Sequence, residues 1–474
     1  MVALKILLRI VFSLVLVLAA AVGYLWVQPP ELLRVGANYS AKIVCSNVFL
    51  AGRDAQEVLR TDVQAPGVSL LKLMRISVDQ PHGVVRAGLL GFIGHGLAEY
   101  RRGSGCTALP DGKLDVAVAG EIPAATSAGT AGAATSASPP VHGDADSGAT
   151  LSNALWPEGA RVEVTSTYQS VLANDALVGP GMRGVLVISQ GRIVAERYAP
   201  GFSQETPLLG WSMSKTVTAA LVGLLVKDGK LTLDQAGLWP AGDGRVRIRI
   251  ADLLAMSSGL RFNEEYGAVS DVTRMLYLVA DAAGFARAQP LIHPVGEVWS
   301  YSSGTANIVS RLVQDTGGGP GFVQERLFKP LSMQSAVIER DEYGTFVGSS
   351  YMYATARDWA RFGQFLAQNG EWQGQPLLPA GFVDTMASPV AASAGEYGHG
   401  FVWLWGSDPV TPGKNPDTAF GIPSDTFYLS GHDGQTVAVI RSRQLVIVRL
   451  GLTPYAARYS PQRLIQAVLE VKPQ

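Results

Sequence analysis

The sequence predicts an α+β fold for residues 156–474, with one antiparallel sheet formed by both ends of this unit and a mostly helical lobe formed by its middle. Two β-rich runs near its start are separated by Gln190-Gly191, which predicts a hairpin. Two runs near its end are separated by Ser442-Arg443, which predicts a second one. The expected strands are 183–189, 192–198, 435–440 and 445–450, and the expected helices are 272–286, 306–315, 355–369 and 461–471.

A very apolar helix is predicted to follow the first hairpin. Residues 217–226 are almost all apolar, and Asp228-Gly229 marks the expected end of the helix. A helix that is apolar on every side is usually buried in the core. Polar residues in its first turn should therefore be partly desolvated.

Residues 1–30 predict a membrane anchor. Residues 10–27 form an uncharged apolar run of 18 residues, close to the shortest helix that spans a bilayer. Lys5 and Arg9 precede the run, which predicts that the rest of the chain lies outside the cytoplasm. We expect a protein held in the inner membrane and facing the periplasm. The alternative is a secretion signal that is cleaved, which would leave a secreted protein.

Residues 31–118 are expected to form a small mixed α/β unit. Residues 44–50 and 84–90 predict strands, and residues 54–60 predict a short helix. The two cysteines of the chain, Cys45 and Cys106, both lie in this unit. An even pair in an exported protein predicts one disulfide, with two buried free thiols as the alternative.

Composition predicts a linker and excludes some classes of function. Residues 119–155 are dominated by small residues and contain no lysine or arginine, which predicts a flexible linker between the two units. The net charge of −1 gives no electrostatic reason to expect a nucleic-acid partner. The six histidines are scattered and no Cys/His cluster is present, so we predict neither a metal site nor a cofactor.

The start of the apolar helix carries a candidate nucleophile. Ser212 and Lys215 are three residues apart, so they share one face of the helix. A serine hydroxyl needs a neighbouring base to become a nucleophile, and a lysine becomes a base when burial lowers its pKa. The Ser-x-x-Lys pattern alone is weak, because Ser69 and Lys72 repeat it by chance.

Two further motifs follow in the same unit. Tyr301 and Ser303 are two residues apart and can point into one cleft, where a tyrosine near an ammonium can move a proton. Residues 431–435, Gly-His-Asp-Gly-Gln, lead into a predicted strand. Gly434 would let a substrate approach the strand edge, and the amide of Gln435 could act as an oxyanion donor beside the amide of Ser212.

The order of these motifs resembles that of the serine hydrolases of the β-lactamase superfamily, in which Ser-x-x-Lys is characteristic. The resemblance is closer to the class C-like branch, which includes 6-aminohexanoate-dimer hydrolases, some esterases and D-amino-acid peptidases. It covers most of residues 180–470 and also rests on residues 228–234, 250–260 and 353–363. It implies a β-lactamase/transpeptidase-like fold.

The resemblance also implies roles for individual residues. Ser212 would form an acyl-enzyme, and Lys215 and Tyr301 would share the proton transfers, with the identity of the base left open. The amides of Ser212 and Gln435 would bind the oxyanion. Substrate-binding roles are implied for four residues, with Tyr266 near the leaving group: Ser303, His432, Gly434 and Tyr266.

The sequence departs from the antibiotic-degrading enzymes in its third motif, where His432 stands in place of their lysine. The leading hypothesis is therefore an extracytoplasmic serine hydrolase that cleaves a small amide or ester. One alternative is a D-amino-acid peptidase or a β-lactamase. The other is a non-catalytic envelope binding protein that has the same fold.

Overall fold

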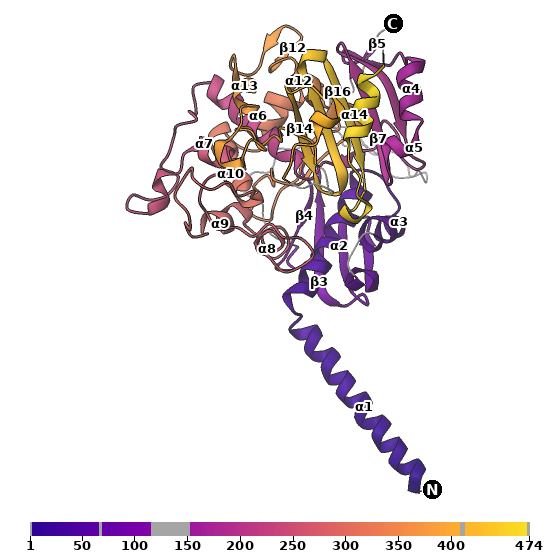
Figure 1. The fold of residues 1–474 in the computed structure, drawn as a ribbon. Helices are drawn as coiled ribbons and strands as arrows, with labels where there is room; N and C mark the ends of the chain where they lie inside the picture. Colours follow the sequence, from indigo (N-terminus) through magenta and orange to yellow (C-terminus); the bar gives the residue numbers. More distant parts are fainter. Residues whose placement is uncertain (1, 66–68, 115–151, 408–412, 472–474) are drawn as a thin grey trace, which may run out of the picture.

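The computed structural model describes residues 2–65, 69–114, 152–407 and 413–471. A five-stranded antiparallel sheet runs through the larger unit in the order β14-β15-β16-β7-β8 (Figure 1). The start and the end of this unit meet in the sheet where β7 pairs with β16. The prediction of one sheet built from both ends of this unit is confirmed. The strands are β7 Met182–Ser189, β8 Arg192–Tyr198, β14 Thr426–Gly431, β15 Gln435–Ile440 and β16 Leu445–Gly451.

Both faces of this sheet are covered. Alternate side chains of a strand point to opposite faces. One face, which includes Val437 and Val446, belongs to the main core with the helix α12, Ala356–Ala367. The other face, which includes Ala438 and Ile447, packs against α4, Ser166–Leu172, and α14, Gln462–Leu469. Because both faces are covered, β15 and β16 are buried along their whole length, and their apolar residues follow one another over 437–440 and 445–448 rather than alternating.

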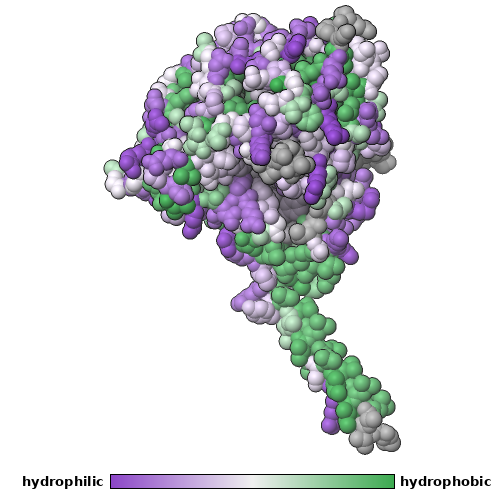
Figure 2. Space-filling model, in the orientation of Figure 1, coloured by the Kyte–Doolittle hydropathy of each residue, from purple (hydrophilic) through white to green (hydrophobic). Residues whose placement is uncertain are grey.

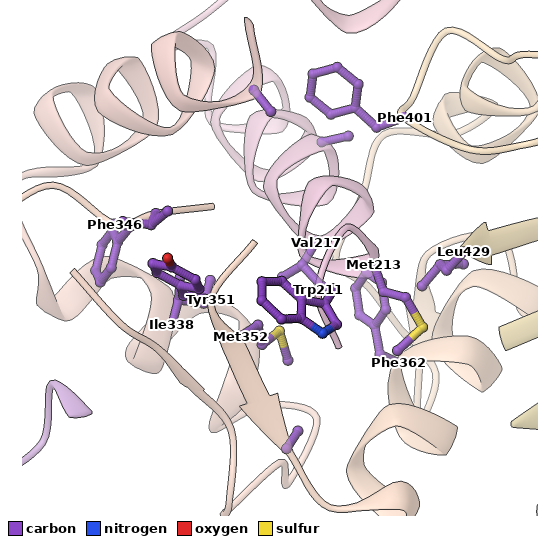
Figure 3. Packing of buried hydrophobic residues seen from close by; sticks show 14 of the residues in the cluster. Trp211, Met213, Val217, Ile338, Phe346, Tyr351, Met352, Phe362, Phe401 and Leu429 are labelled. Carbon is purple, nitrogen blue, oxygen red and sulfur yellow. The ribbon is translucent and has the colours of Figure 1, made fainter. Parts of the chain in front are cut away.

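The predicted helical lobe is present between the two hairpins. The apolar helix α6, Met213–Lys227, is buried over most of its length, and part of the core around it is drawn in Figure 3. One long helix expected over 272–286 is instead two, because Asp281 caps the second one through Gly284 N and interrupts the first. The other helices of the lobe are α7 Ile250–Leu254, α8 Asp271–Tyr277, α9 Ala282–Arg287 and α10 Ser303–Gly317.

The chain starts with a long exposed helix, α1, Val2–Val27, which extends away from the rest of the molecule (Figure 1) and is almost entirely apolar in Figure 2. Among the described residues it is the one helix long and apolar enough to cross a membrane, over Leu4–Val27. It is followed after three residues by α2, Glu31–Phe49.

The unit that follows is a helix packed on a sheet. Helix α2 lies on four antiparallel strands in the order β1-β2-β3-β4. The strand predicted at 44–50 is wrong, because these residues form the last turns of α2. The β-branched residues Val44 and Val48 favour a strand locally, but Ala37, Ala41 and Val44 form one buried helical face. The strands are β1 Met74–Asp79, β2 Val84–Leu89, β3 Ile93–Arg101 and β4 Gly105–Ala108.

A disulfide joins Cys45 on α2 to Cys106 on β4. The short helix expected at 54–60 is present as α3, Ala55–Val58, and continues as a π-helical turn over Leu59–Gln64. The predicted linker, 119–155, lies outside the described residues except for 152–155. That end of it forms β5, Ser152–Leu155, which pairs with β6, Gly159–Arg161.

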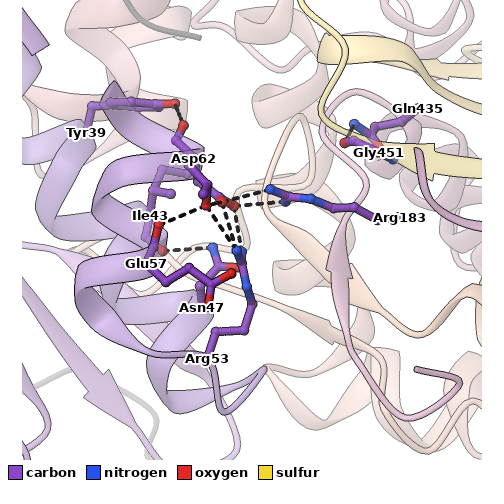
Figure 4. A network of polar contacts seen from close by, with 10 residues as sticks. Tyr39, Ile43, Asn47, Arg53, Glu57, Asp62, Arg183, Gln435 and Gly451 are labelled. Carbon is purple, nitrogen blue, oxygen red and sulfur yellow. Dashed lines mark hydrogen bonds and ion pairs between the residues drawn. The ribbon is translucent and has the colours of Figure 1, made fainter. Parts of the chain in front are cut away.

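Buried charges join this unit to the larger one. Lys42 on α2 forms an ion pair with Glu339, and both side chains are almost fully buried. The Glu339 carboxylate also accepts from Cys106 N and Ser46 Oγ. A second network surrounds Asp62, whose carboxylate binds two arginines (Figure 4), among them Arg183 of β7 at 2.7 Å. Opposite charges that are buried together need each other, because neither has water to solvate it.

We expect the Lys42→Met variant to lose about 3–5 kcal/mol of unfolding free energy, because it leaves the buried Glu339 carboxylate without its cation. Adding Glu339→Gln removes that charge and keeps an oxygen for Cys106 N, so the double variant should regain most of the loss. Urea unfolding in detergent measures both. The control is Lys329→Met, which breaks an exposed pair with Glu325 and should cost less than about 1 kcal/mol. Equal losses at the two lysines would contradict a structural role for the buried pair.

Candidate active site

Ser212 lies at the start of α6, on a turn that is held from both sides. The preceding strand β9, Leu208–Leu209, pairs with β11, Met352–Ala354, and Gly210 N donates to Met352 O at 2.9 Å. Trp211 follows with φ of 48°, a left-handed conformation that costs energy for a bulky residue. Its ring is buried in the core (Figure 3), which supplies the packing energy to hold this turn.

Lys215 is one turn further along α6 and is fully buried. Its Nζ donates at 2.9 Å to Ser212 Oγ, at 2.9 Å to Ser303 Oγ and at 3.0 Å to Ser349 O. These three bonds use all the hydrogens of an ammonium group. Burial lowers the pKa of Lys215 to about 8, and the negative charge of Glu264 acts in the opposite direction.

Tyr301 lies beside this pair, just before α10. The ring centroid of Tyr301 is 4.8 Å from Lys215 Nζ and 5.4 Å from the ring centroid of Trp403. Burial raises the pKa of the Tyr301 phenol, and the charge of Glu264 raises it further, whereas a hydrogen bond with Ser212 acts in the opposite direction. The phenol therefore stays protonated over the physiological range of pH.

A residue that the sequence did not reveal, Glu264, completes the site. Its carboxylate accepts from Ser303 N at 2.8 Å, from Ser303 Oγ at 2.5 Å and from Tyr266 OH at 3.3 Å. Ser303 thus accepts from Lys215 and donates to Glu264, which links the two charges through one hydroxyl. A carboxylate at the first residue of α10 is also stabilised by the helix N-terminus. Glu264 is 39 residues from Ser303 in a loop, so no local spacing marks it.

His432 and Tyr266 form an aromatic pair beside Trp211. The ring centroids of His432 and Tyr266 are 5.1 Å apart, and the edge of His432 meets Trp211 at 5.7 Å. The His432 side chain is 47% exposed, and its Nε2 lies 3.6 Å from Asp433 Oδ1. Burial raises the pKa of the Asp433 carboxyl, and charge on His432 counteracts this.

Two glycines bring the third motif against the first. A Cβ on Gly431 would lie 2.2 Å from Gly210 O, and a Cβ on Gly210 would lie 2.2 Å from the ring of Trp359. Only glycines allow the end of β14 to touch the turn before Ser212. Gln435, which pairs with Gly431 across the hairpin, is thereby held near that turn.

The side chain of Gln435 bonds Gly451 N and O at 2.9 and 2.6 Å (Figure 4), so only the backbone of this residue remains for a role in the site. Gly434 has φ of 81°, and the space beside it is filled by Arg449 and Thr453. A glycine is therefore needed at position 434 because of its positive φ in the turn.

The structure therefore brings together Ser212, Lys215, Tyr301 and Ser303, with Tyr266 and His432 beside Trp211, whereas Gly434 packs against Arg449 and Thr453. The chance pair Ser69 and Lys72 is exposed in the N-terminal unit. The disulfide of Cys45 and Cys106 also lies in that unit. Within the described residues, no group of three or more His, Cys, Asp or Glu could hold a metal ion.

Comparisons with known proteins bear on the family and the fold of this unit. A family model described as Beta-lactamase matches residues 174–469. A solved structure from Bacillus anthracis, provisionally named a 6-aminohexanoate-dimer hydrolase, is 21% identical with a TM-score of 0.51, covering 65% of this chain and 85% of its own. A family VIII carboxylesterase is 16% identical with a TM-score of 0.51, covering 65% and 98%. These likenesses show the fold. No curated protein sequence matches the chain.

We expect Gly431→Ala to destabilise the protein by about 1–3 kcal/mol, because the added methyl group has no room beside Gly210 O. The matched control is Gly321→Ala, where a Cβ meets nothing within 4 Å and the change should be neutral or slightly stabilising. Thermal or urea unfolding compares the two variants. A Gly431→Ala variant as stable as Gly321→Ala would contradict the close contact.

Proposed function

The chain belongs to the beta-lactamase family, and we propose that it is a serine hydrolase that cleaves a small amide or ester through an acyl-enzyme on Ser212. The observation that carries the proposal is the 2.9 Å contact between the fully buried amine of Lys215 and the hydroxyl of Ser212. A buried lysine that contacts a serine at a helix start can activate it as a nucleophile.

Lys215 is the base in this proposal, and Tyr301 is a proton donor. With a pKa of about 8, the amine of Lys215 is partly neutral near physiological pH. Its two remaining hydrogens still reach Ser303 Oγ and Ser349 O, and its lone pair then faces Ser212. Tyr301, whose pKa is raised, holds its proton and can give it to a leaving group.

Acylation follows from these positions. As Ser212 Oγ forms a bond to the substrate carbonyl carbon, its proton passes to Lys215. The amides of Ser212 and Gln435 bind the negative oxygen that develops, helped by the N-terminus of α6. The bond from the carbon to the leaving nitrogen or oxygen then breaks. The leaving atom takes a proton from Tyr301, which is reprotonated by Lys215.

Deacylation repeats these steps with water in place of the serine hydroxyl. Water attacks the acyl carbon and gives a proton to neutral Lys215, and the bond to Ser212 Oγ breaks as Lys215 returns that proton to the serine. Substrate contacts come from residues around the mouth of the site. His432 and Tyr266 present aromatic surface there, and Ser303 holds the amine of Lys215 in place.

The N-terminal helix supports a membrane location for the proposed activity. We propose that α1 anchors the protein and that residues 31–474 lie outside the cytoplasm. The span Leu4–Val27 has a mean hydropathy of 2.6 and none of it is buried by the rest of the molecule. A disulfide between Cys45 and Cys106 suits an oxidising compartment. In this arrangement residues 31–118 form a small unit that packs on the hydrolase unit of 156–474 through buried contacts, and the linker of 119–155 joins the two along the chain.

We expect Ser212→Ala to lower the hydrolysis of a p-nitrophenyl ester by about 10³-fold or more, because the nucleophile is lost. The matched control is Ser69→Ala, which alters the exposed chance motif and should keep full activity. A fluorophosphonate label, located by mass spectrometry, should attach to Ser212. Unchanged turnover or a label on another serine would overturn the assignment. A panel of esters, amides and nitrocefin then identifies the substrate class, and preferential nitrocefin turnover would favour a β-lactamase.

We expect kcat/KM to rise with pH through about 8, since Lys215 must lose its proton to act as the base. Glu264→Gln removes a negative charge that raises the pKa of Lys215, so the rise should move to lower pH. Glu265→Gln, a change at the exposed neighbouring residue, should leave the profile in place. A rise only above pH of about 10 would indicate the Tyr301 phenolate as the base instead.

A further inference from the structure

Four large apolar side chains are exposed on the N-terminal unit where α1 leaves it. The exposed fractions are 41% for Leu32, 49% for Leu73, 54% for Leu90 and 46% for Phe92. Figure 2 shows apolar surface at this base of the molecule, continuous with α1. We call Leu32, Leu73, Leu90 and Phe92 the apolar tip.

The residues of the tip come from separate segments that the fold brings together. Leu90, in the turn between β2 and β3, donates its N–H to Leu73 O at 3.0 Å. The start of β3 lies against the start of α2, because a Cβ on Gly94 would lie 2.9 Å from Leu33 O. The turn that carries Leu90 and Phe92 is therefore fixed beside the first residues of α2.

The tip is also fixed to the end of the membrane-spanning helix. His95, three residues after Phe92, bonds Trp26 O through Nε2 at 2.8 Å, and the two rings meet edge to face with centroids 5.9 Å apart. Trp26 is the last residue but one of the span. If α1 crosses a bilayer, Trp26 lies at its surface, and the tip must lie there as well.

Charges around the tip suit an anionic surface. Lys72, directly before Leu73, and Arg75, two residues after it, are both exposed. Glu31, the acidic residue directly before Leu32, is paired with Arg274 at 2.7 Å, so its charge is balanced within the protein. Apolar residues flanked by basic ones are the pattern of a segment that rests in the interface of a membrane with anionic lipids.

We propose that the apolar tip inserts into the surface of the bilayer that α1 spans, with Lys72 and Arg75 on anionic headgroups. This inference rests on the proposed anchoring of α1. The hydrolase unit is then held at a set orientation on the membrane by two contacts rather than swinging on one helix. The tip would otherwise expose apolar side chains to water beside the anchor, which costs free energy.

The test uses the full chain in vesicles of phosphatidylethanolamine and phosphatidylglycerol. A fluorophore is attached to Phe92→Cys, and quenching by nitroxide on the lipid chains is measured. Tyr24→Cys, inside the span, is the positive control. Val164→Cys is the negative control, since it is an exposed apolar site next to α4, at the far end of the molecule from α1 (Figure 1). The buried Cys45–Cys106 disulfide leaves the added cysteine as the site of labelling.

We expect quenching at position 92 to be several-fold that at position 164. Lys72→Gln with Arg75→Gln should reduce it, whereas Lys227→Gln with Lys230→Gln should not. Quenching at 24 but not at 92 would overturn the tip and leave the anchor intact. Self-quenching of the label at 92 without lipid quenching would show a second copy on the tip, which also overturns the proposal. Failure of the chain to float with vesicles would overturn the anchor itself, and the tip with it.

Discussion

The candidate site depends on the burial of one amine. Lys215 has no access to water, so its Nζ must find every partner within the protein, and it takes them from three elements: Ser212 at the start of α6, Ser303 at the start of α10, and the carbonyl of Ser349. Because hydrogen bonds act only over a short range of distances, the lysine keeps the starts of the two helices close together. Glu264 supplies the nearby negative charge that makes the burial tolerable, through the hydroxyl of Ser303. The burial of Lys215 therefore both lowers its pKa and holds the starts of α6 and α10 together.

Support for this arrangement reaches into the N-terminal unit. The amine of Lys42, already paired with Glu339, lies 4.2 Å from the ring centroid of Tyr351. The ring of Tyr351 in turn lies 6.2 Å from that of Trp211, the residue before Ser212. An unbroken series of buried contacts therefore runs from the disulfide-bonded helix to the candidate nucleophile. The N-terminal unit therefore contributes, through Lys42 and Tyr351, to the packing around the turn of Trp211.

Features set by local pattern could be predicted from the sequence, and features set by distant contacts could not. The two hairpins and α6 follow from apolar periods and turn residues, and the structure contains them close to the expected bounds. The strand prediction for Val44–Phe49 is wrong because β-branched residues favour a strand locally, whereas the packing of α2 on its sheet, which no local pattern shows, makes this segment helical. The role of Glu264 could not be predicted because its partner, Ser303, is 39 residues away in the sequence. The order of the motifs, unlike their spacing, is rarely produced by chance, and it marks Ser212, Lys215 and Tyr301 as candidates.

The ion pair between Lys42 and Glu339 has a consequence for the order in which the chain is made. Its two members are 297 residues apart, so ribosomes complete the whole N-terminal unit long before its counter-charge exists. Likewise, Asn38 donates to Tyr277 O and Asp62 pairs with Arg183, and both of these partners are synthesised later. During synthesis the early segment must keep one face of α2 hydrated. Contacts of such long separation are slow to form, so the final docking of this face belongs to the last stage of maturation.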